Sequence, residues 1–351
     1  MKRALAAPLA LFLLLGAAPL PRVQGDLLRT TDAPRLADYG LFDAAGRPAP
    51  GVQRYTLNTP LFSDGAEKYR YVWLPPGTRA DYRASGPLAF PVGTVLVKRF
   101  AFPADARAPG TNLTPIETRL LIHRPSGWVA LSYVEEGGEA VLKRAGKRIA
   151  VTQIGSDGKA MTIDYAVPNQ NQCKTCHQSG EAITPIGPTG GNLNDGRQLQ
   201  MWQASGRLAG LPADGGVRLA RWDNVAEPLD ARARAYLAVN CGHCHNRAGF
   251  ASNSGLWLDP EEREPAHIGI NKRPVAAGRG SGGLEVSIAP GAPDKSILLH
   301  RMLSSEPGVM MPQFGRSLVH AEGVALLRQW IAAMPDPASA TPATAAAPSG
   351  R

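Results

Sequence analysis

The chain has little of several features that mark large protein classes. It contains only 4 cysteines, 7 histidines and 6% aromatic residues among 351. After residue 25 no apolar run approaches the roughly 20 residues that a membrane helix needs. Residues 26–167 contain no G-x-S-x-G, no phosphate-binding glycine loop and no metal-ligand spacing. These absences argue against a membrane-spanning mature protein and against a recognisable catalytic motif in the N-terminal part.

The first 25 residues hold the one strongly apolar segment. Lys2 and Arg3 precede ALAAPLALFLLLGAA, and Val23 and Gly25 take the −3 and −1 positions of an expected cleavage site. This run is too short and too rich in small residues for a membrane helix, although an uncleaved N-terminal anchor is the alternative. We therefore expect a signal peptide over residues 1–25 and an exported, soluble protein in the periplasm.

All four cysteines lie in two copies of Cys-x-x-Cys-His, one in NQCKTCHQSG and one in VNCGHCHNRAG. Four cysteines in an exported protein would by default suggest two disulfides, but this spacing is that of c-type haem attachment. Two thiols three residues apart can each add to one vinyl group of a porphyrin, and the next histidine ligates the iron. A zinc site built from both cysteine pairs is the rival, but it leaves the two histidines unexplained. We expect two covalent haems, one held by Cys173, Cys176 and His177 and one by Cys241, Cys244 and His245.

Two helices are predicted around the second motif. EPLDARARAYLAVN (residues 227–240) carries apolar residues on one face, with Asp230 as a possible N-cap, and leads directly into Cys241. Apolar residues recur at helical spacing in 323–334, and Pro335 is expected to end that helix.

A helix before the motif, a Met-Pro loop and a closing helix with a tryptophan resemble the layout of a class I cytochrome c domain. The segment PGAPDKSILLHRM before the loop adds to this resemblance. It implies that Met311, which precedes Pro312, is the distal ligand of the second haem, and Met310 is the alternative. Both methionines could instead be ordinary core residues. Methionine–histidine ligation raises the reduction potential of a haem.

The distal side of the first haem is less defined by the sequence. KAMTIDYAVPNQNQ (159–172) predicts a strand and a loop before the motif, not a helix. A backbone carbonyl at Gly187-Pro188 is expected to orient His177. Residues 194–212 predict a helix that contains Met201, which is a candidate distal ligand or a packing residue. The other possibilities are His267, His300, Met161 or an open iron.

Residues 26–167 are predicted to form a β-rich domain. Runs such as YRYVWLPPG and FPVGTVLVKRFAF are β-branched and aromatic, and residues 124–127 and 155–158 read as hairpin turns. His123 lies in an apolar run and is interpreted as structural. The expected fold class is α+β, with this domain followed by a mainly α-helical cytochrome c-like region. The expected divisions are 168–223 for the first haem segment, 224–335 for the second haem domain and 336–351 for a disordered tail.

The net charge gives a modest indication of partners. The chain has a formal charge of +9, and loss of three cations with the signal leaves +6. Nothing in the sequence indicates nucleic-acid binding. A basic cluster could steer an acidic redox partner, although a solvated strand edge is the simpler interpretation. The cluster consists of Lys143, Arg144, Lys147 and Arg148.

Several segments together resemble a family of bacterial exported diheme c-type cytochromes without an established role. These are PLFSDGAEKYRYVWLPPG, FPVGTVLVKRF, ETRLL, CKTCH, and NCGHCH followed by SNSGL, and the resemblance covers nearly all of residues 30–335. It implies periplasmic electron transfer with a redox protein as partner. The alternatives are a diheme peroxidase or oxygen-activating enzyme with an open first haem, and the haem subunit of a dehydrogenase whose donor binds the β domain. An electron-transfer protein is expected rather than a catalyst.

Overall fold

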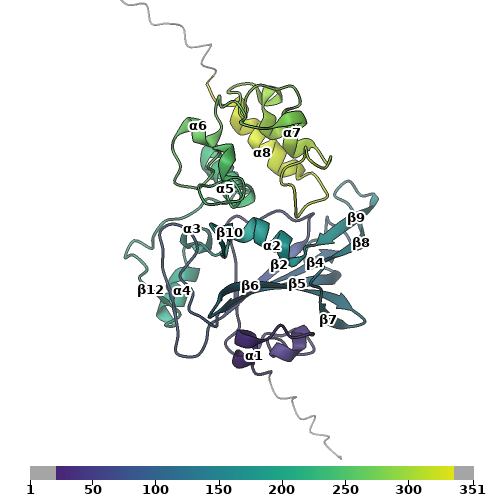
Figure 1. The fold of residues 1–351 in the computed structure, drawn as a ribbon, viewed down its shortest axis with the longest axis vertical. Helices are drawn as coiled ribbons and strands as arrows, with labels where there is room; N and C mark the ends of the chain where they lie inside the picture. The colour runs from purple at the N-terminus through teal and green to yellow at the C-terminus, as the bar shows by residue number, and fades with distance from the viewer. Residues whose placement is uncertain (1–20, 336–351) are drawn as a thin grey trace, which may run out of the picture.

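The computed structural model describes residues 21–335 of the chain (Figure 1). The predicted signal peptide lies mostly outside this range, and the predicted tail at 336–351 lies wholly outside it. No helix within the described range is both long enough and apolar enough to cross a membrane, as expected for that part of the chain.

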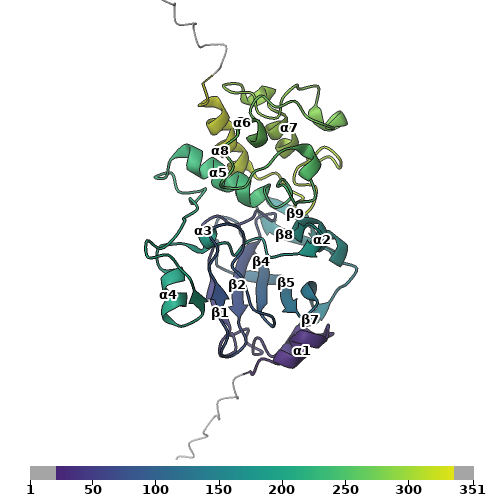
Figure 2. The same ribbon diagram turned by 60° about the vertical axis from the view of Figure 1, so that its left-hand side comes forward.

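A six-stranded antiparallel sheet forms the centre of the N-terminal region (Figure 2). Its strands pair antiparallel in the order in which they occur in the chain. The strands, from one edge to the other, are β1 (Gln53–Tyr55), β2 (Glu67–Trp73), β4 (Val95–Pro103), β5 (Leu113–Arg124), β6 (Gly127–Glu136) and β7 (Glu139–Leu142). This sheet agrees with the β-rich character expected of residues 26–167.

Both predicted hairpin turns are confirmed. β5 ends at Arg124 and β6 begins at Gly127, where Arg124 and Gly127 pair across the turn. A separate hairpin consists of β8 (Lys147–Ile154) and β9 (Ala160–Val167). Gly127 and Gly158 have φ values of 111° and 80°, which glycine adopts without steric cost.

The two faces of the sheet contribute to different cores. On one face Val97 and Leu120 pack against Leu28 of α1 (Gly25–Thr30) and against the 3-10 helix η1 (Leu36–Tyr39). On the opposite face Leu96 and Leu121 pack against the segment that follows β9. Figure 1 shows α1 on the side of the sheet away from the C-terminal region.

The segment after β9 covers this second face with short elements. Asn58 fastens it to the sheet domain, because its amide donates to the carbonyls of Asn194 and Leu219 at 2.7 and 2.9 Å. The parallel pair of β3 with β12 adds a further connection. The elements are α2 (Gln170–His177), β10 (Gln178–Ser179), β11 (Ala182–Ile183), α3 (Gly190–Leu193), α4 (Gln198–Ala204), β12 (Leu208–Ala209) and, before β4, β3 (Ala80–Asp81).

The C-terminal region has a core of its own around two helices. Ala233 and Leu237 of the first pack with Leu327 and Ile331 of the last, as their helical spacing predicted. Asp230 lies inside the first turn, where it accepts from Trp330 Nε1 at 2.8 Å, and Pro228 is the N-cap instead. The elements are α5 (Leu229–Asn240), η2 (Ser252–Ser254), α6 (Pro265–Ile268), η3 (Gly278–Ser281), η4 (Pro293–Lys295), α7 (Ile297–Leu303) and α8 (Ala321–Ala332).

The prediction that a mainly α-helical, cytochrome c-like region with both Cys-x-x-Cys-His motifs follows the β-rich domain is wrong. The α-helices of residues 168–335 have only 8, 4, 7, 12, 4, 7 and 12 residues, so fewer than half of these residues are α-helical. Sustained apolar periodicity is confined to α5 and α8, and frequent Gly and Pro in residues 249–293 break the chain into turns. As a whole the structure combines one large antiparallel sheet with short helices.

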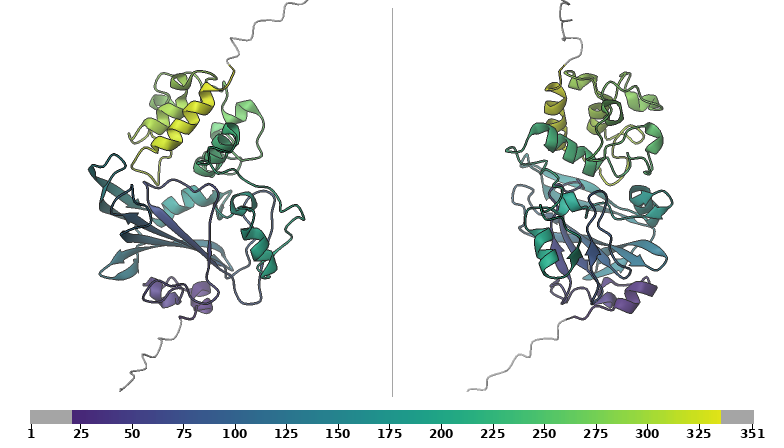
Figure 3. Two further views of the ribbon diagram at one scale, coloured as in Figure 1. Left: turned by 180° about the vertical axis from the view of Figure 1, so that it is seen from behind. Right: turned by 90° about the vertical axis from the view of Figure 1, so that its left-hand side faces the viewer.

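The C-terminal region lies at one end of the sheet domain, next to α2 and the β8–β9 hairpin (Figure 3). Phe62 N donates to Asn240 Oδ1 at 2.8 Å. The Asp64 carboxylate accepts from the backbone of Ser317 and Leu318 at 2.7 and 2.8 Å. These hydrogen bonds of Phe62 and Asp64 hold the C-terminal region against the sheet domain.

Candidate functional site

A large cavity lies where the sheet domain meets the C-terminal region. Its volume is about 1120 Å³, above the roughly 300–1,000 Å³ of common small-molecule sites. Most of its wall is apolar, and it contains both Cys-x-x-Cys-His motifs and the Met-Pro loop. The wall includes Cys173, Cys176, His177, Cys241, Cys244, His245, Met310 and Met311.

The first motif is itself helical. α2 begins at Gln170, where Asn169 and Gln172 form a reciprocal capping box. The preceding strand β9 is confirmed, but the loop expected up to residue 172 ends at Asn169 and is three residues shorter. Helical spacing puts Cys173 and Cys176 on adjacent turns of one face. Burial raises the pKa of Cys173.

The His177 imidazole is held by a backbone carbonyl, as expected, but by a different one. Its Nδ1 lies 2.8 Å from Thr184 O. A carbonyl can only accept, so Nδ1 carries the proton and the lone pair is on Nε2. The carbonyls of Gly187 and Pro188 accept instead from Thr189 and Leu88, so the predicted role of that dipeptide is wrong. Burial lowers the pKa of His177 to about 4.

The second motif follows α5 and has an equivalent arrangement. His245 Nδ1 lies 3.0 Å from Ser254 Oγ, whose hydroxyl donates to Ala251 O at 2.6 Å. The hydroxyl therefore accepts from Nδ1, and Nε2 again keeps its lone pair. Burial lowers the pKa of His245 to about 4 and raises that of Cys241 to about 12.

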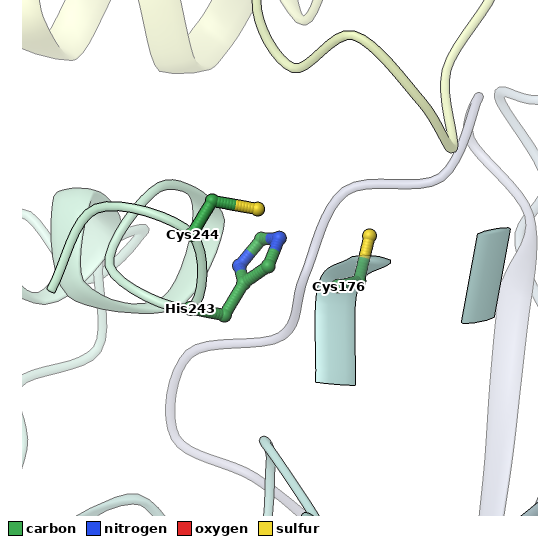
Figure 4. Close-up of side chains that lie close together, drawn as sticks. All are labelled: Cys176, His243 and Cys244. Atoms are coloured by element: carbon green, nitrogen blue, oxygen red, sulfur yellow. The ribbon is translucent and has the colours of Figure 1, made fainter. Parts of the chain in front are cut away.

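The two motifs meet at Cys176 and Cys244. Their sulfur atoms and a ring nitrogen of His243 all lie within 4.8 Å of one another (Figure 4). The contact between the thiols lowers the pKa of Cys176 and raises that of Cys244. His243 Nδ1 lies 3.2 Å from Val239 O, which leaves Nε2 for the thiols. His243 was missed as a site residue, although its position between the cysteines of the second motif was a signal.

A buried arginine holds the Met-Pro loop against the cavity. Arg316 is 8% exposed and donates to five backbone carbonyls, including that of Met311 at 2.9 Å. The loop is also anchored by Met311 N, which donates to Arg301 O at 3.0 Å. The sequence did not predict a role for Arg316, because its acceptors are backbone carbonyls of α7 and the loop. Every residue carries such a group, so no sequence pattern marks them.

The other candidate ligands of the first motif lie elsewhere. Met201 is on α4 with 60% of its surface exposed. Met161 packs in the core beneath the β8–β9 hairpin, and His267 packs against Trp257 with ring centroids 3.9 Å apart. Among the described residues, the cavity wall includes neither these three nor His300.

The predicted basic cluster is paired within the chain. Lys143 and Lys147 contact Glu136 at 2.7 and 2.5 Å. Arg144 contacts Asp32 at 2.8 Å, and Arg148 pairs with Asp164. These carboxylates offset the positive charge, which favours the interpretation of a solvated strand edge. His123 Nδ1 bonds Phe90 O at 2.9 Å and its ring stacks on Trp128, as a structural histidine would.

No family model, curated protein or solved structure matches this chain. The functional argument therefore depends on the residues and geometry of the cavity.

Proposed function

We propose that the protein is an exported diheme c-type cytochrome that transfers electrons in the periplasm. Cys173 and Cys176 would attach the first haem and Cys241 and Cys244 the second. His177 and His245 would ligate the two irons, and Met311 would be the distal ligand of the second. The observation that carries the proposal is that both complete motifs line one cavity of about 1120 Å³.

The two histidines support this assignment. Each donates from Nδ1 to an oxygen of its own loop, Thr184 O or Ser254 Oγ. Such an outer hydrogen bond fixes ring orientation and directs the Nε2 lone pair toward a metal. A histidine that only filled the core would not require the same tautomer at both motifs.

The cysteines support it as well. In the attachment chemistry each S–H adds across a vinyl C=C, so that sulfur bonds one carbon and hydrogen the other, with no oxidant or reductant consumed. When bound, each haem would supply one-electron Fe(III)/Fe(II) chemistry. The chain's own contribution is to attach, to orient the imidazoles and to exclude water with the apolar wall.

The test is the haem content of the full-length protein made in a host that attaches c-type haem. A pyridine haemochrome assay is expected to give two haems per chain. C241A/C244A is expected to retain one, and C173A/C176A the other. A wild-type protein with one haem or none would contradict the proposal.

A structural metal site is the second candidate, because Cys176, His243 and Cys244 offer three ligand atoms within 4.8 Å. Zinc binds such sulfur and nitrogen donors. H243A separates the two functions, since His243 is a ligand only in the metal site. Two retained haems and no zinc in H243A support the cytochrome; stoichiometric zinc in wild type that is lost in H243A supports the metal site.

The distal ligand of the first haem distinguishes an electron-transfer protein from the peroxidase alternative. None of the distal ligands named for it from the sequence lies on the cavity wall among the described residues, which favours an open iron or a ligand of another kind. The ferric spectrum distinguishes these cases: a high-spin charge-transfer band would indicate an open iron and the enzyme class, and a purely low-spin spectrum would indicate electron transfer.

A further inference from the structure

Three cationic side chains form a row across the sheet on its cavity face. Arg70 of β2 is directly opposite Lys98 of β4, and Lys98 is opposite Arg119 of β5. All three line the cavity. Cross-strand neighbours of this kind have Cβ atoms roughly 4.5–5.5 Å apart, and like charges there are destabilising. The row therefore requires a compensating negative charge.

Only one end of the row is neutralised by the protein. Arg119 forms a bidentate pair with Glu117 at 2.6 and 2.8 Å, and Tyr165 OH also donates to that carboxylate at 2.8 Å. Glu117 is fully buried and lies two residues from Arg119 on β5, where it is opposite Phe100. Both of its carboxylate oxygens accept from Arg119, and it forms no hydrogen bond or ion pair with Arg70 or Lys98.

Arg70 and Lys98 have no such partner among residues 21–335. Arg70 is only 9% exposed, and the one hydrogen bond of its guanidinium in that range is a long 3.4 Å contact with Lys68 O. The Lys98 ammonium makes no hydrogen bond or ion pair there, and its Nζ lies 5.4 Å from the centre of the Phe100 ring. Burial, followed by the charges of Arg119 and Arg70, lowers the pKa of Lys98 to about 7.

Other carboxylates near this wall are already occupied. Asp164 lines the cavity and pairs with Arg148, and Asp64 accepts from the backbone of Ser317 and Leu318. A buried charge without a partner costs several kcal/mol. An arginine and a lysine side by side on a cavity wall match the acceptors of an oxyanion.

We propose that Arg70 and Lys98 bind a carboxylate or similar oxyanion inside the cavity. Two sources share this chemistry: a small diffusible anion, and a propionate of one of the haems. The second source rests on the proposed function, and the first does not.

The experiment uses the full-length purified protein after its haem content has been measured. Arg70→Leu and Lys98→Met remove the charges and keep apolar stems, whereas Arg70→Lys and Lys98→Arg keep the charges. Arg107→Leu and Lys159→Met are matched controls, because Arg107 has an exposed ion pair and Lys159 is exposed. Succinate and inorganic phosphate are titrated by calorimetry at constant ionic strength.

A diffusible anion predicts that wild type binds one of the two probes and that R70L and K98M each weaken binding at least about tenfold. The charge-conserving variants and the controls should remain within about threefold. A haem propionate predicts no probe binding but a lower midpoint potential of one haem in R70L and K98M, because a lost cation disfavours the reduced iron.

The proposal is overturned if no probe binds and both potentials stay at their wild-type values in folded variants. If R70L and K98M do not fold, R70Q and K98Q replace them, because they also remove the charge but keep a polar side chain. Weaker probe binding or a lower haem potential in either variant supports the site, and neither effect overturns it. A chain without haem would refute the proposed function, while probe binding would still decide the oxyanion site.

Discussion

The Sγ atoms of Cys176 and Cys244 lie within 4.8 Å of each other, one at the end of α2 and the other in the turn after α5. Both thiols belong to Cys-x-x-Cys-His motifs, so under the proposed function two haems would be joined to the chain at almost the same point. This proximity favours a relay between two closely spaced haems and argues against two independent haem modules.

This contact predicts which disulfide a haem-free chain forms. In an oxidising compartment Cys176 and Cys244 should cross-link, because their sulfurs already lie within 4.8 Å of each other and a disulfide requires them to close to about 2.05 Å. Cys173 is buried in the sheet core and should stay reduced. Peptide mapping without reductant checks this, with C176A as the control. A Cys173–Cys176 link as the main product would contradict it.

Replacing Met311 should change only the second haem. M311A is expected to lose the long-wavelength absorption band of methionine-ligated ferric haem, and M311H should lower the potential of that haem, because methionine ligation raises it. Met310 is the matched control, since it lines the same cavity. If M310L loses the band and M311A keeps it, Met310 is the ligand.

Removing the Arg316 guanidinium should loosen the Met-Pro loop. R316L would leave up to five carbonyls without their donor, and each buried unsatisfied group costs about 1–3 kcal/mol. We expect a loss of more than about 2 kcal/mol in unfolding free energy, measured by denaturant titration, together with loss of the methionine band. R328L is the control, because the exposed Arg328–Asp294 pair should contribute about 0–1 kcal/mol. Equal stability of R316L and R328L would refute the role.

The acceptors of the two histidines differ in a way that mutation can test. S254A removes the side-chain oxygen that orients His245, whereas T184V leaves the Thr184 carbonyl that orients His177. A histidine that loses this hydrogen bond is a less basic ligand, so S254A should raise the potential of the second haem. T184V should leave both potentials unchanged. Redox titration decides, and a shift in T184V as large as in S254A would be inconsistent with these contacts.

In the protein without haem or added oxyanion, Lys98 should make stability depend on pH above neutrality. Its pKa in that folded chain is about 7, against about 10.4 in an unfolded chain. Between these values the unfolded state binds more protons, so stability rises as pH increases from about 7 to 10. K98M should flatten this part of a plot of melting temperature against pH, and K159M should not. Lys68, whose pKa is also lowered by burial, should retain part of the slope. An unchanged slope in K98M would contradict the prediction.

Features that depend on neighbouring residues were determined by the sequence alone. The Cys-x-x-Cys-His spacing defines a chemical unit of five residues, and the turns at 124–127 and 155–158 follow from local glycine conformations. The apolar faces of α5 and α8 likewise follow from helical periodicity. The prediction that residues 224–335 are mainly helical was wrong. It extended the helical periodicity of two segments over the glycine- and proline-rich stretch between them.

Relationships between distant segments were decided only by the tertiary structure. Cys176 meets Cys244 because the fold brings the end of α2 and the turn after α5 together at the wall of one cavity. Arg316 and Asp64 hold the Met-Pro loop through backbone groups, which carry no sequence signal. Arg70, Lys98 and Arg119 form a row through strand register, and a shift of one residue would turn each to the other face of the sheet. Local patterns supply the two Cys-x-x-Cys-His motifs, whereas packing and register set their surroundings.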